Sequence, residues 1–118
     1  MRLWNALRYS LAGLREALRH PACRLELMAI VVAIPVALVL PLGAVERLLL
    51  VGSVVATFVV ELLNTSIETV INRIGTERHE LSRIAKDMGS AAVFVVAALA
   101  AAVWLVIAAP AAWSLVNA

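Results

Sequence analysis

Residues 48–74 read LLLVGSVVATFVVELLNTSIETVINRI, and this stretch decides the fold. Up to Val60 it holds only apolar or small side chains, whereas polar groups recur from Glu61 onward. The stretch exceeds the ~20 residues that are needed to cross about 30 Å of hydrocarbon. It must be helical there, because lipid offers the backbone no hydrogen-bond partners. We therefore predict a transmembrane helix whose polar groups are confined to one half of the bilayer.

Two further apolar spans flank this helix, at about 25–42 and about 88–109, and Pro110 is expected to close the second of them. Hydrophobic residues make up 64% of the 118 residues and charged residues 15%, with a mean hydropathy of +0.98. An ordinary soluble domain is only about 45–50% apolar. A soluble domain this small could not bury so much apolar surface. We predict one all-α membrane domain over residues 1–118, with transmembrane helices at about 25–42, 48–74 and 88–109.

An amphipathic helix is predicted over residues 2–20, before the first span. Leu3, Leu7, Leu11, Leu14 and Leu18 recur at three- and four-residue spacings, and arginines occupy the other faces. A basic amphipathic helix with a tryptophan among its apolar residues is typical of the plane of a membrane interface. Pro21 ends the helix, because a proline disfavours the helical conformation in the residue before it.

Basic residues are concentrated in two places: before the first span (Arg2, Arg8, Arg15, Arg19 and Arg24) and between the second and third (Arg73, Arg78, Arg83 and Lys86). Only Arg47 lies between the first two spans. The positive-inside rule then places the N-terminus and the 73–87 loop in the cytoplasm and the C-terminus outside. Trp104 and Trp113 fit an aromatic belt at the outer interface. The net charge of +2 is too small to imply a nucleic-acid partner.

The polar residues of the second span form one stripe. Glu61, Asn64, Thr65, Glu68 and Asn72 follow one another at helical spacings, so they share a face. A charged side chain at the centre of a bilayer costs at least about 2.5 kcal/mol. Two carboxylates on one face should therefore point into a bundle or a hydrated cleft. The alternative is a structural polar seam that holds helices together.

The loop that follows is densely charged, and it ends on the only lysine and the only aspartate of the chain, Lys86 and Asp87. Phosphoryl transfer needs carboxylates for a divalent metal, cations for phosphate charge and an oriented nucleophile. Glu68 suits a metal, Glu61 a buried hydroxyl and Lys86 a phosphate. As alternatives, Lys86 is a snorkelling anchor and Asp87 a cap or ion-pair partner. There is no glycine-rich nucleotide loop, so the residues alone define a membrane-interface site with two carboxylates.

A longer pattern strongly resembles the prokaryotic diacylglycerol kinase family. It consists of Glu61-Leu-Leu-Asn64-Thr-Ser-Ile-Glu68, then Arg73-Ile-Gly, Glu77-Arg-His-Glu-Leu-Ser and Ala85-Lys-Asp-Met-Gly-Ser-Ala-Ala92. Residues 9–15 and 22–26 also resemble the family, so the similarity covers essentially the whole chain. The resemblance implies a homotrimer in the bacterial inner membrane, with active sites shared between subunits. It implies transfer of the γ-phosphate of MgATP to the hydroxyl of diacylglycerol, which gives phosphatidate.

The resemblance also implies roles for individual residues. Glu61 matches the general base and a contact of the lipid substrate. Ser90 matches a second position that contacts the substrate. Glu68 matches the ligand of Mg²⁺, and Asn64 and Asn72 match supporting positions. The positions that match ATP contacts are Arg2, Tyr9, Glu68, Glu77, Arg78, His79, Lys86 and Asp87.

The chain departs from the family pattern at two positions. His20-Pro21 stands where the family usually has a second metal-binding glutamate, and Asn72 stands where it usually has aspartate. Histidine suits Mg²⁺ poorly, because this ion prefers oxygen ligands. The second metal ligand is then either Glu16, one turn earlier on the same face, or His20. These departures allow weakened activity.

Three other functions compete with diacylglycerol phosphorylation. Undecaprenol kinase needs the same site with a longer and thinner acceptor groove. A small proton-coupled transporter would use Glu61 as its carrier, but it would not need the charged 77–87 loop. A non-catalytic oligomeric membrane protein is favoured by Gly52, Ser53 and Ala56 as close-packing positions.

Overall fold

The computed structural model describes residues 2–75 and 79–118, which form helices joined by short turns. In chain order these are α1 (Arg2–Ala17), α2 (Pro21–Val39), α3 (Ala44–Ile74), α4 (Glu80–Val103), a π-helical turn (Trp104–Ala108) and α5 (Ala109–Val116). Three segments are long and apolar enough to cross a membrane: Pro21–Val39, Ala44–Ile74 and Glu80–Val116. By helix length and composition, the prediction of an all-α membrane protein with three spans is confirmed.

The helices begin and end at other residues than the hydropathy pattern predicts. α1 stops at Ala17 rather than at residue 20, and backbone bonds to Arg15, Glu16 and Ala17 close a turn over residues 18–20. Pro21 is the first residue of α2. A backbone N–H in the first turn of a helix has no acceptor within the helix, so the N–H that proline lacks is not missed there. Hydropathy marks the part of a helix that suits lipid: α2, α3 and α4 all begin before that part, whereas α2 ends at Val39, short of the predicted residue 42.

Arg47 closes the hairpin between α2 and α3. Its guanidinium donates hydrogen bonds to the carbonyl oxygens of Ala37, Leu38 and Leu40, at 3.0, 3.4 and 3.2 Å. These carbonyls belong to the end of α2, where no further turn of helix can satisfy them. A cation is also favourable at a helix C-terminus. The one basic residue between the first two spans is thus a helix cap.

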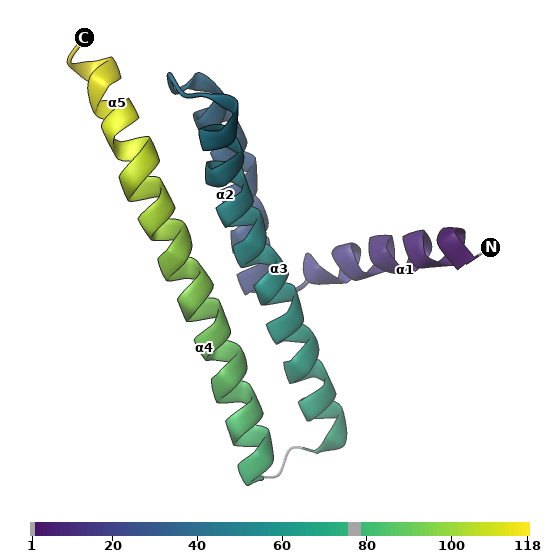
Figure 1. Ribbon diagram of the computed structural model, residues 1–118. Helices are drawn as coiled ribbons and strands as arrows, with labels where there is room; N and C mark the ends of the chain where they lie inside the picture. Colours follow the sequence, from purple (N-terminus) through teal and green to yellow (C-terminus); the bar gives the residue numbers. More distant parts are fainter. Residues whose placement is uncertain (1, 76–78) are drawn as a thin grey trace.

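α3 is the central helix of the bundle (Figure 1). It packs against α2 on one side and against α4 on the other. One buried cluster lies near the α2–α3 hairpin and joins Leu40 and Leu50 to Ala108. A second cluster joins Ala17 and Cys23 to Phe58, where the end of α1 meets α2 and α3.

α1 leaves this bundle steeply, and its N-terminus lies far from the other helices (Figure 1). Every residue from Arg2 to Glu16 is exposed, including the apolar side chains of Leu3, Trp4 and Leu7. Only Ala17, at the end of the helix, is buried. The single chain therefore offers most of α1 nothing to pack against.

The expectation that Pro110 closes the third span is wrong. The helical path continues through Pro110 to Val116. A proline inside a helix loses one backbone hydrogen bond and crowds the preceding turn. Here the wider π-helical turn over Trp104–Ala108 comes just before it, and such turns absorb a local interruption of the hydrogen-bond ladder.

Trp104 begins that π-helical turn and packs inward. Its indole N–H donates a hydrogen bond to the backbone oxygen of Leu50 at 3.1 Å, which ties the third span to α3. The aromatic-belt interpretation therefore fails for Trp104, whose polar atom is used inside the bundle. Trp113 is exposed and remains compatible with it.

Candidate active site

The polar stripe of α3 divides into a buried and an exposed part. Glu61 and Asn64 are only 7% and 9% exposed, whereas Glu68 and Asn72 are exposed. The neighbours account for the buried part, because Gly89 of α4 lies against Asn64 and Cys23 of α2 lies beside Thr65. One sequence pattern thus gives a carboxylate inside the bundle and another at its surface.

Glu61 accepts a hydrogen bond from the hydroxyl of Thr65, at 3.3 Å between Oγ1 and Oε1. Thr65 in turn lies 3.5 Å from the Cys23 Sγ atom of α2. Glu26, also on α2, lies close enough for its carboxylate to repel that of Glu61. Carboxylates in membrane-spanning helices are costly, so Glu26 and Glu61 are candidates for a functional site.

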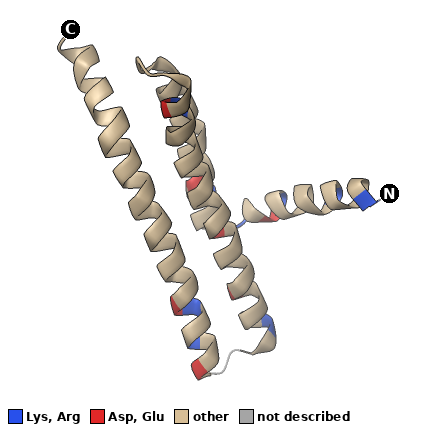
Figure 2. Cartoon of the chain, viewed as in Figure 1, with Lys and Arg blue, Asp and Glu red and all other residues tan. Residues whose placement is uncertain are grey.

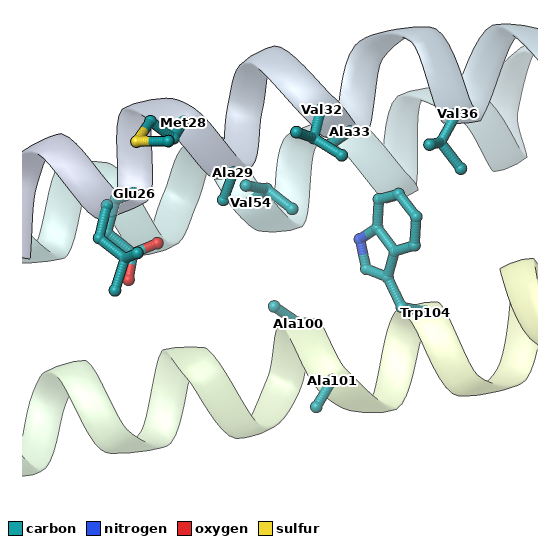
Figure 3. Close-up of a pocket in the computed structure, with 11 residues that line it drawn as sticks. Glu26, Met28, Ala29, Val32, Ala33, Val36, Val54, Ala100, Ala101 and Trp104 are labelled. Carbon is teal, nitrogen blue, oxygen red and sulfur yellow. The ribbon is translucent and has the colours of Figure 1, made fainter.

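Glu26 stands at one end of an apolar groove of about 590 Å³ between α2 and α4 (Figure 3). Its carboxylate points into the groove, toward α4 (Figure 3). Met28, Val32 and Ala100 line the length of the groove, and Trp104 lies toward its other end. A groove with apolar walls and an acidic end suits a long hydrocarbon chain that carries one polar group.

Asn64 faces Gly89 across the α3–α4 contact. A Cβ atom added at Gly89 would overlap the side-chain amide of Asn64, so Asn64 or α4 must shift to admit any larger residue. The Asn64 Oδ1 atom is buried, and no residue in the described part of the chain gives it a hydrogen bond. Buried polar atoms usually find a partner, so this oxygen is available to a group that the single chain does not supply.

Replacing Gly89 by alanine should destabilise the protein by about 1–3 kcal/mol, the usual cost of overpacking. The added methyl group must push either Asn64 or α4 away. Thermal unfolding of the purified protein in micelles measures this change. Gly52→Ala is the matched control, since a Cβ there meets nothing within 4 Å and should change stability by less than about 0.5 kcal/mol. The double variant Gly89→Ala/Asn64→Ala should recover stability, and no recovery would show that the clash lies elsewhere.

The start of α4 carries a row of ion pairs. Arg83 bonds both Glu80, one turn before it, and Asp87, one turn after it, the latter at 2.8 Å. Asp87 is thus paired with Arg83, and the sequence spacing of four residues is the signal that could have shown it. His79 caps α4, since its Nδ1 atom accepts the backbone N–H of Leu81 at 3.1 Å. Lys86 and Ser90 are exposed on the same helix.

The charges gather at the end of the bundle where α3 finishes and α4 starts, and along α1 (Figure 2). The third span beyond that end is free of charged residues (Figure 2). Arg2 and Tyr9 lie on α1, whose N-terminal part projects away from α3 and α4 (Figure 1). The single chain therefore does not bring the predicted ATP contacts together. Glu77 and Arg78 lie outside the described residues.

Glu16 and His20 lie together at the end of α1, with their side-chain atoms 3.9 Å apart. Arg19 also contacts Glu16, at 3.5 Å. Glu16 and His20 line a pocket with Thr65 and Thr69 of α3. Glu68 is not among the residues that line this pocket.

A Mg²⁺ cage of protein ligands is not formed by the described residues, among which no three His, Cys, Asp or Glu side chains converge. Mg²⁺ does not require such a cage, because it is usually bound by one or two carboxylates together with substrate phosphates and water. The exposed carboxylate of Glu68 fits this manner of binding. Residues that sequence reasoning did not select are Cys23, Glu26, Arg47, Thr65 as a partner of Glu61, Arg83 and Gly89.

A bundle of three helices long and apolar enough to cross a membrane, with a buried carboxylate on its central helix, defines a class of membrane-embedded helical proteins. Residues 8–108 match the sequence model of the prokaryotic diacylglycerol kinase family. The Diacylglycerol kinases of Escherichia coli (strain K12) and Pseudomonas aeruginosa are each 44% identical to this chain over 107 residues, which cover 90% of it and 88% and 87% of the relatives. That of Haemophilus influenzae is 44% identical over 103 residues, 86% of this chain and 87% of the relative. The chain belongs to the prokaryotic diacylglycerol kinase family.

Proposed function

We propose that this protein is an ATP-dependent diacylglycerol kinase. The observation that carries the proposal is the buried carboxylate of Glu61 inside a membrane-spanning bundle, where it accepts a hydrogen bond from Thr65. Family membership and the relatives' shared name support the same activity. The hydroxyl oxygen of diacylglycerol attacks the γ-phosphorus of ATP, and the bond from that phosphorus to the β–γ bridging oxygen breaks. The products are phosphatidate and ADP.

Glu61 acts as the general base in this proposal. Its carboxylate takes the proton of the attacking hydroxyl as the new phosphorus–oxygen bond forms. A base needs to lie within hydrogen-bond reach of that proton, so the lipid hydroxyl would enter the bundle beside Glu61. The acyl chains lie against the apolar groove walls, and Ser90 contacts the substrate near its head group.

ATP binds at the charged end of the bundle. Lys86 would neutralise phosphate charge there, and Glu68 would hold Mg²⁺, whose positive charge would offset the negative charge of the phosphates. Asn64 and Asn72 support this part of α3. The other residues proposed to contact ATP are Arg2, Tyr9, Glu77, Arg78, His79 and Asp87.

The protein assembles as a homotrimer with shared active sites. Two observations support this assembly: the N-terminal part of α1 projects away from its own bundle (Figure 1), and the α1 residues from Arg2 to Glu16, which include Tyr9, are exposed in the single chain. A neighbouring subunit would supply the missing side of the site. Sedimentation equilibrium in density-matched micelles tests the assembly, with three chains per particle as the expected result.

The chain lies in a bacterial inner membrane, with α1 in the plane of the cytoplasmic interface. The exposed apolar side chains of α1, from Leu3 to Leu14, would enter the lipid surface while its arginines contact head groups. A helix that lies across the bundle axis, as α1 does, has the orientation that this position requires (Figure 1).

A C-terminal fusion to alkaline phosphatase should be active, because the C-terminus is proposed to lie in the periplasm. Alkaline phosphatase folds only where disulfides form. The matched control is a fusion after Gly75, in the basic loop that we place in the cytoplasm, and this fusion should be inactive. Activity of the loop fusion with inactivity of the C-terminal one would reverse the orientation.

Replacing Glu16 by glutamine should raise the Mg²⁺ concentration needed for half-maximal activity, if Glu16 supplies the second carboxylate near Glu68. Arg19→Gln is the matched control, because it removes the other member of the ion pair and should leave the Mg²⁺ requirement unchanged. Should His20 stand at the metal instead, His20→Glu would increase activity at low Mg²⁺, since it restores an oxygen ligand. If none of these variants changes the Mg²⁺ titration, Glu68 of α3 binds the metal without help from α1.

One assay tests the proposed function directly. The purified protein is mixed with MgATP and diacylglycerol in micelles, and phosphatidate is measured. Undecaprenol serves as the competing acceptor, so preferential formation of undecaprenyl phosphate would assign the protein to the other lipid substrate. Absence of product from either acceptor would overturn the proposal and favour a non-catalytic membrane protein.

A further inference from the structure

The hydroxyl of Thr65 differs from every other hydroxyl on α3. The side chains of Ser53, Thr57, Ser66 and Thr69 donate hydrogen bonds to backbone oxygens of their own helix. This is the usual behaviour of Ser and Thr inside helices. Thr65 instead donates to a side chain, the Oε1 atom of Glu61 one turn earlier, at 3.3 Å. The one hydroxyl that departs from this behaviour therefore bonds Glu61, the residue proposed as the general base.

Cys23 explains why Thr65 behaves differently. This cysteine lies on α2, is fully buried, and places its sulfur 3.5 Å from the Thr65 hydroxyl oxygen. A threonine hydroxyl has one hydrogen, and an ionised carboxylate can only accept. With the Thr65 hydrogen given to Glu61, the thiol of Cys23 must donate to Thr65. The donor and the acceptor of both hydrogen bonds are thereby fixed: Cys23 donates to Thr65, and Thr65 donates to Glu61.

These two hydrogen bonds, from Cys23 to Thr65 and from Thr65 to Glu61, hold one oxygen of the Glu61 carboxylate. Among residues 2–75 and 79–118, Oε1 accepts the bond from Thr65, whereas no hydrogen bond is formed to Oε2. The carboxylate of Glu26 on α2 bears the same charge as that of Glu61, so it offers the second oxygen no hydrogen bond. On the α4 side, the residues that line a pocket with Asn64, one turn further along α3, are uncharged: Ala85, Met88, Gly89 and Ala92. A bond to Oε1 therefore decides which way the carboxylate turns.

We propose that Thr65 is a positioning residue for the kinase reaction, which holds the Glu61 carboxylate so that its second oxygen takes the proton of the lipid hydroxyl. Cys23 fixes the rotation of the Thr65 hydroxyl from the neighbouring helix. This inference rests on the proposed role of Glu61 as the base. It assigns the α2–α3 contact a part in catalysis that its apolar packing alone would not give.

Thr65→Val tests the proposal, because valine keeps the shape of threonine and removes only the hydroxyl. It should lower kcat by about tenfold, the lower end of what a hydrogen bond to a charged group contributes. The KM for MgATP should not change. Thr65→Ser keeps the hydroxyl and should restore kcat to within about threefold of the original protein, because serine loses only a methyl group. Thr57→Val is the matched control, since Thr57 lies two turns earlier on α3, is buried, and bonds a backbone oxygen instead of a side chain.

The outcomes separate this inference from the proposed function. If the original protein makes no phosphatidate, the proposed function fails. If it does, and Thr65→Val keeps full kcat or Thr57→Val loses as much, the positioning role is overturned. Combining Thr65→Val with Glu61→Gln gives a second check, because the threonine change should have no further effect once the carboxylate is gone. Should Thr65→Val not fold, Thr65→Ala carries the same comparison, and Cys23→Ala should lower kcat more than Cys23→Ser.

Discussion

Replacing Glu61 by glutamine should lower kcat for phosphatidate formation by about 10²–10⁴-fold, the usual contribution of a general base. The amide keeps the size of the side chain and can still accept the hydrogen bond from Thr65, but it cannot take a proton from the lipid hydroxyl. Glu61 is only 7% exposed, so bulk water cannot readily replace it as the base. MgATP binding should be nearly unchanged, because the nucleotide is proposed to bind two turns further along α3.

Steady-state kinetics in micelles and a MgATP titration of the same samples measure both quantities. Glu46→Gln is the matched control, since it removes one exposed carboxylate from the opposite end of α3. It should change neither kcat nor MgATP affinity. A Glu61→Gln variant that turns over normally would show that the buried carboxylate is a structural polar group and that the proposed mechanism is wrong.

The amino-acid sequence predicts the fold well because the signal for each transmembrane helix lies in the contiguous residues of that helix. A run of about 20 apolar residues already commits the chain to cross the bilayer as a helix. What happens at Pro110 is not recorded locally, because the π-helical turn before it depends on how Trp104 packs against α3. The role of Arg47 likewise depends on the folded structure. Its charge is visible in the sequence, but its use as a cap depends on the geometry of the hairpin.

The candidate site is recorded in the sequence only in part. Helical spacing places Glu61 and Glu68 on one stripe, yet spacing cannot show that one is buried and the other exposed, since neighbouring helices decide this. The bond between Cys23 and Thr65 joins residues 42 positions apart, so it depends on the register of α2 against α3. The family pattern assigns roles to Arg2 and Lys86, and these roles remain predictions because one chain does not bring the two residues together.

Replacing Glu68 by glutamine should weaken MgATP binding by about 10- to 150-fold and lower kcat as well. A contact to a charged group typically contributes about 1.5–3 kcal/mol, and this range corresponds to that change in affinity. Glu68 is exposed at the charged end of α3, where a metal-bound triphosphate can reach it from water. A neutral amide is a weaker ligand for Mg²⁺ than a carboxylate, so part of the loss should be recovered at high Mg²⁺ concentration.

Recovery by Mg²⁺ is what distinguishes Glu68 from Glu61, although both are carboxylates on one helix face. The Glu61→Gln defect lies in the proton transfer, which no concentration of Mg²⁺ can replace, whereas the Glu68→Gln defect lies in an equilibrium that Mg²⁺ concentration shifts. MgATP titrations of both variants, repeated at low and high Mg²⁺, measure the difference. Loss of nucleotide binding by Glu61→Gln and its retention by Glu68→Gln would reverse the two roles. Full activity of both variants would mean that the stripe only holds helices together, because neither proton transfer nor metal binding would then depend on a carboxylate of α3.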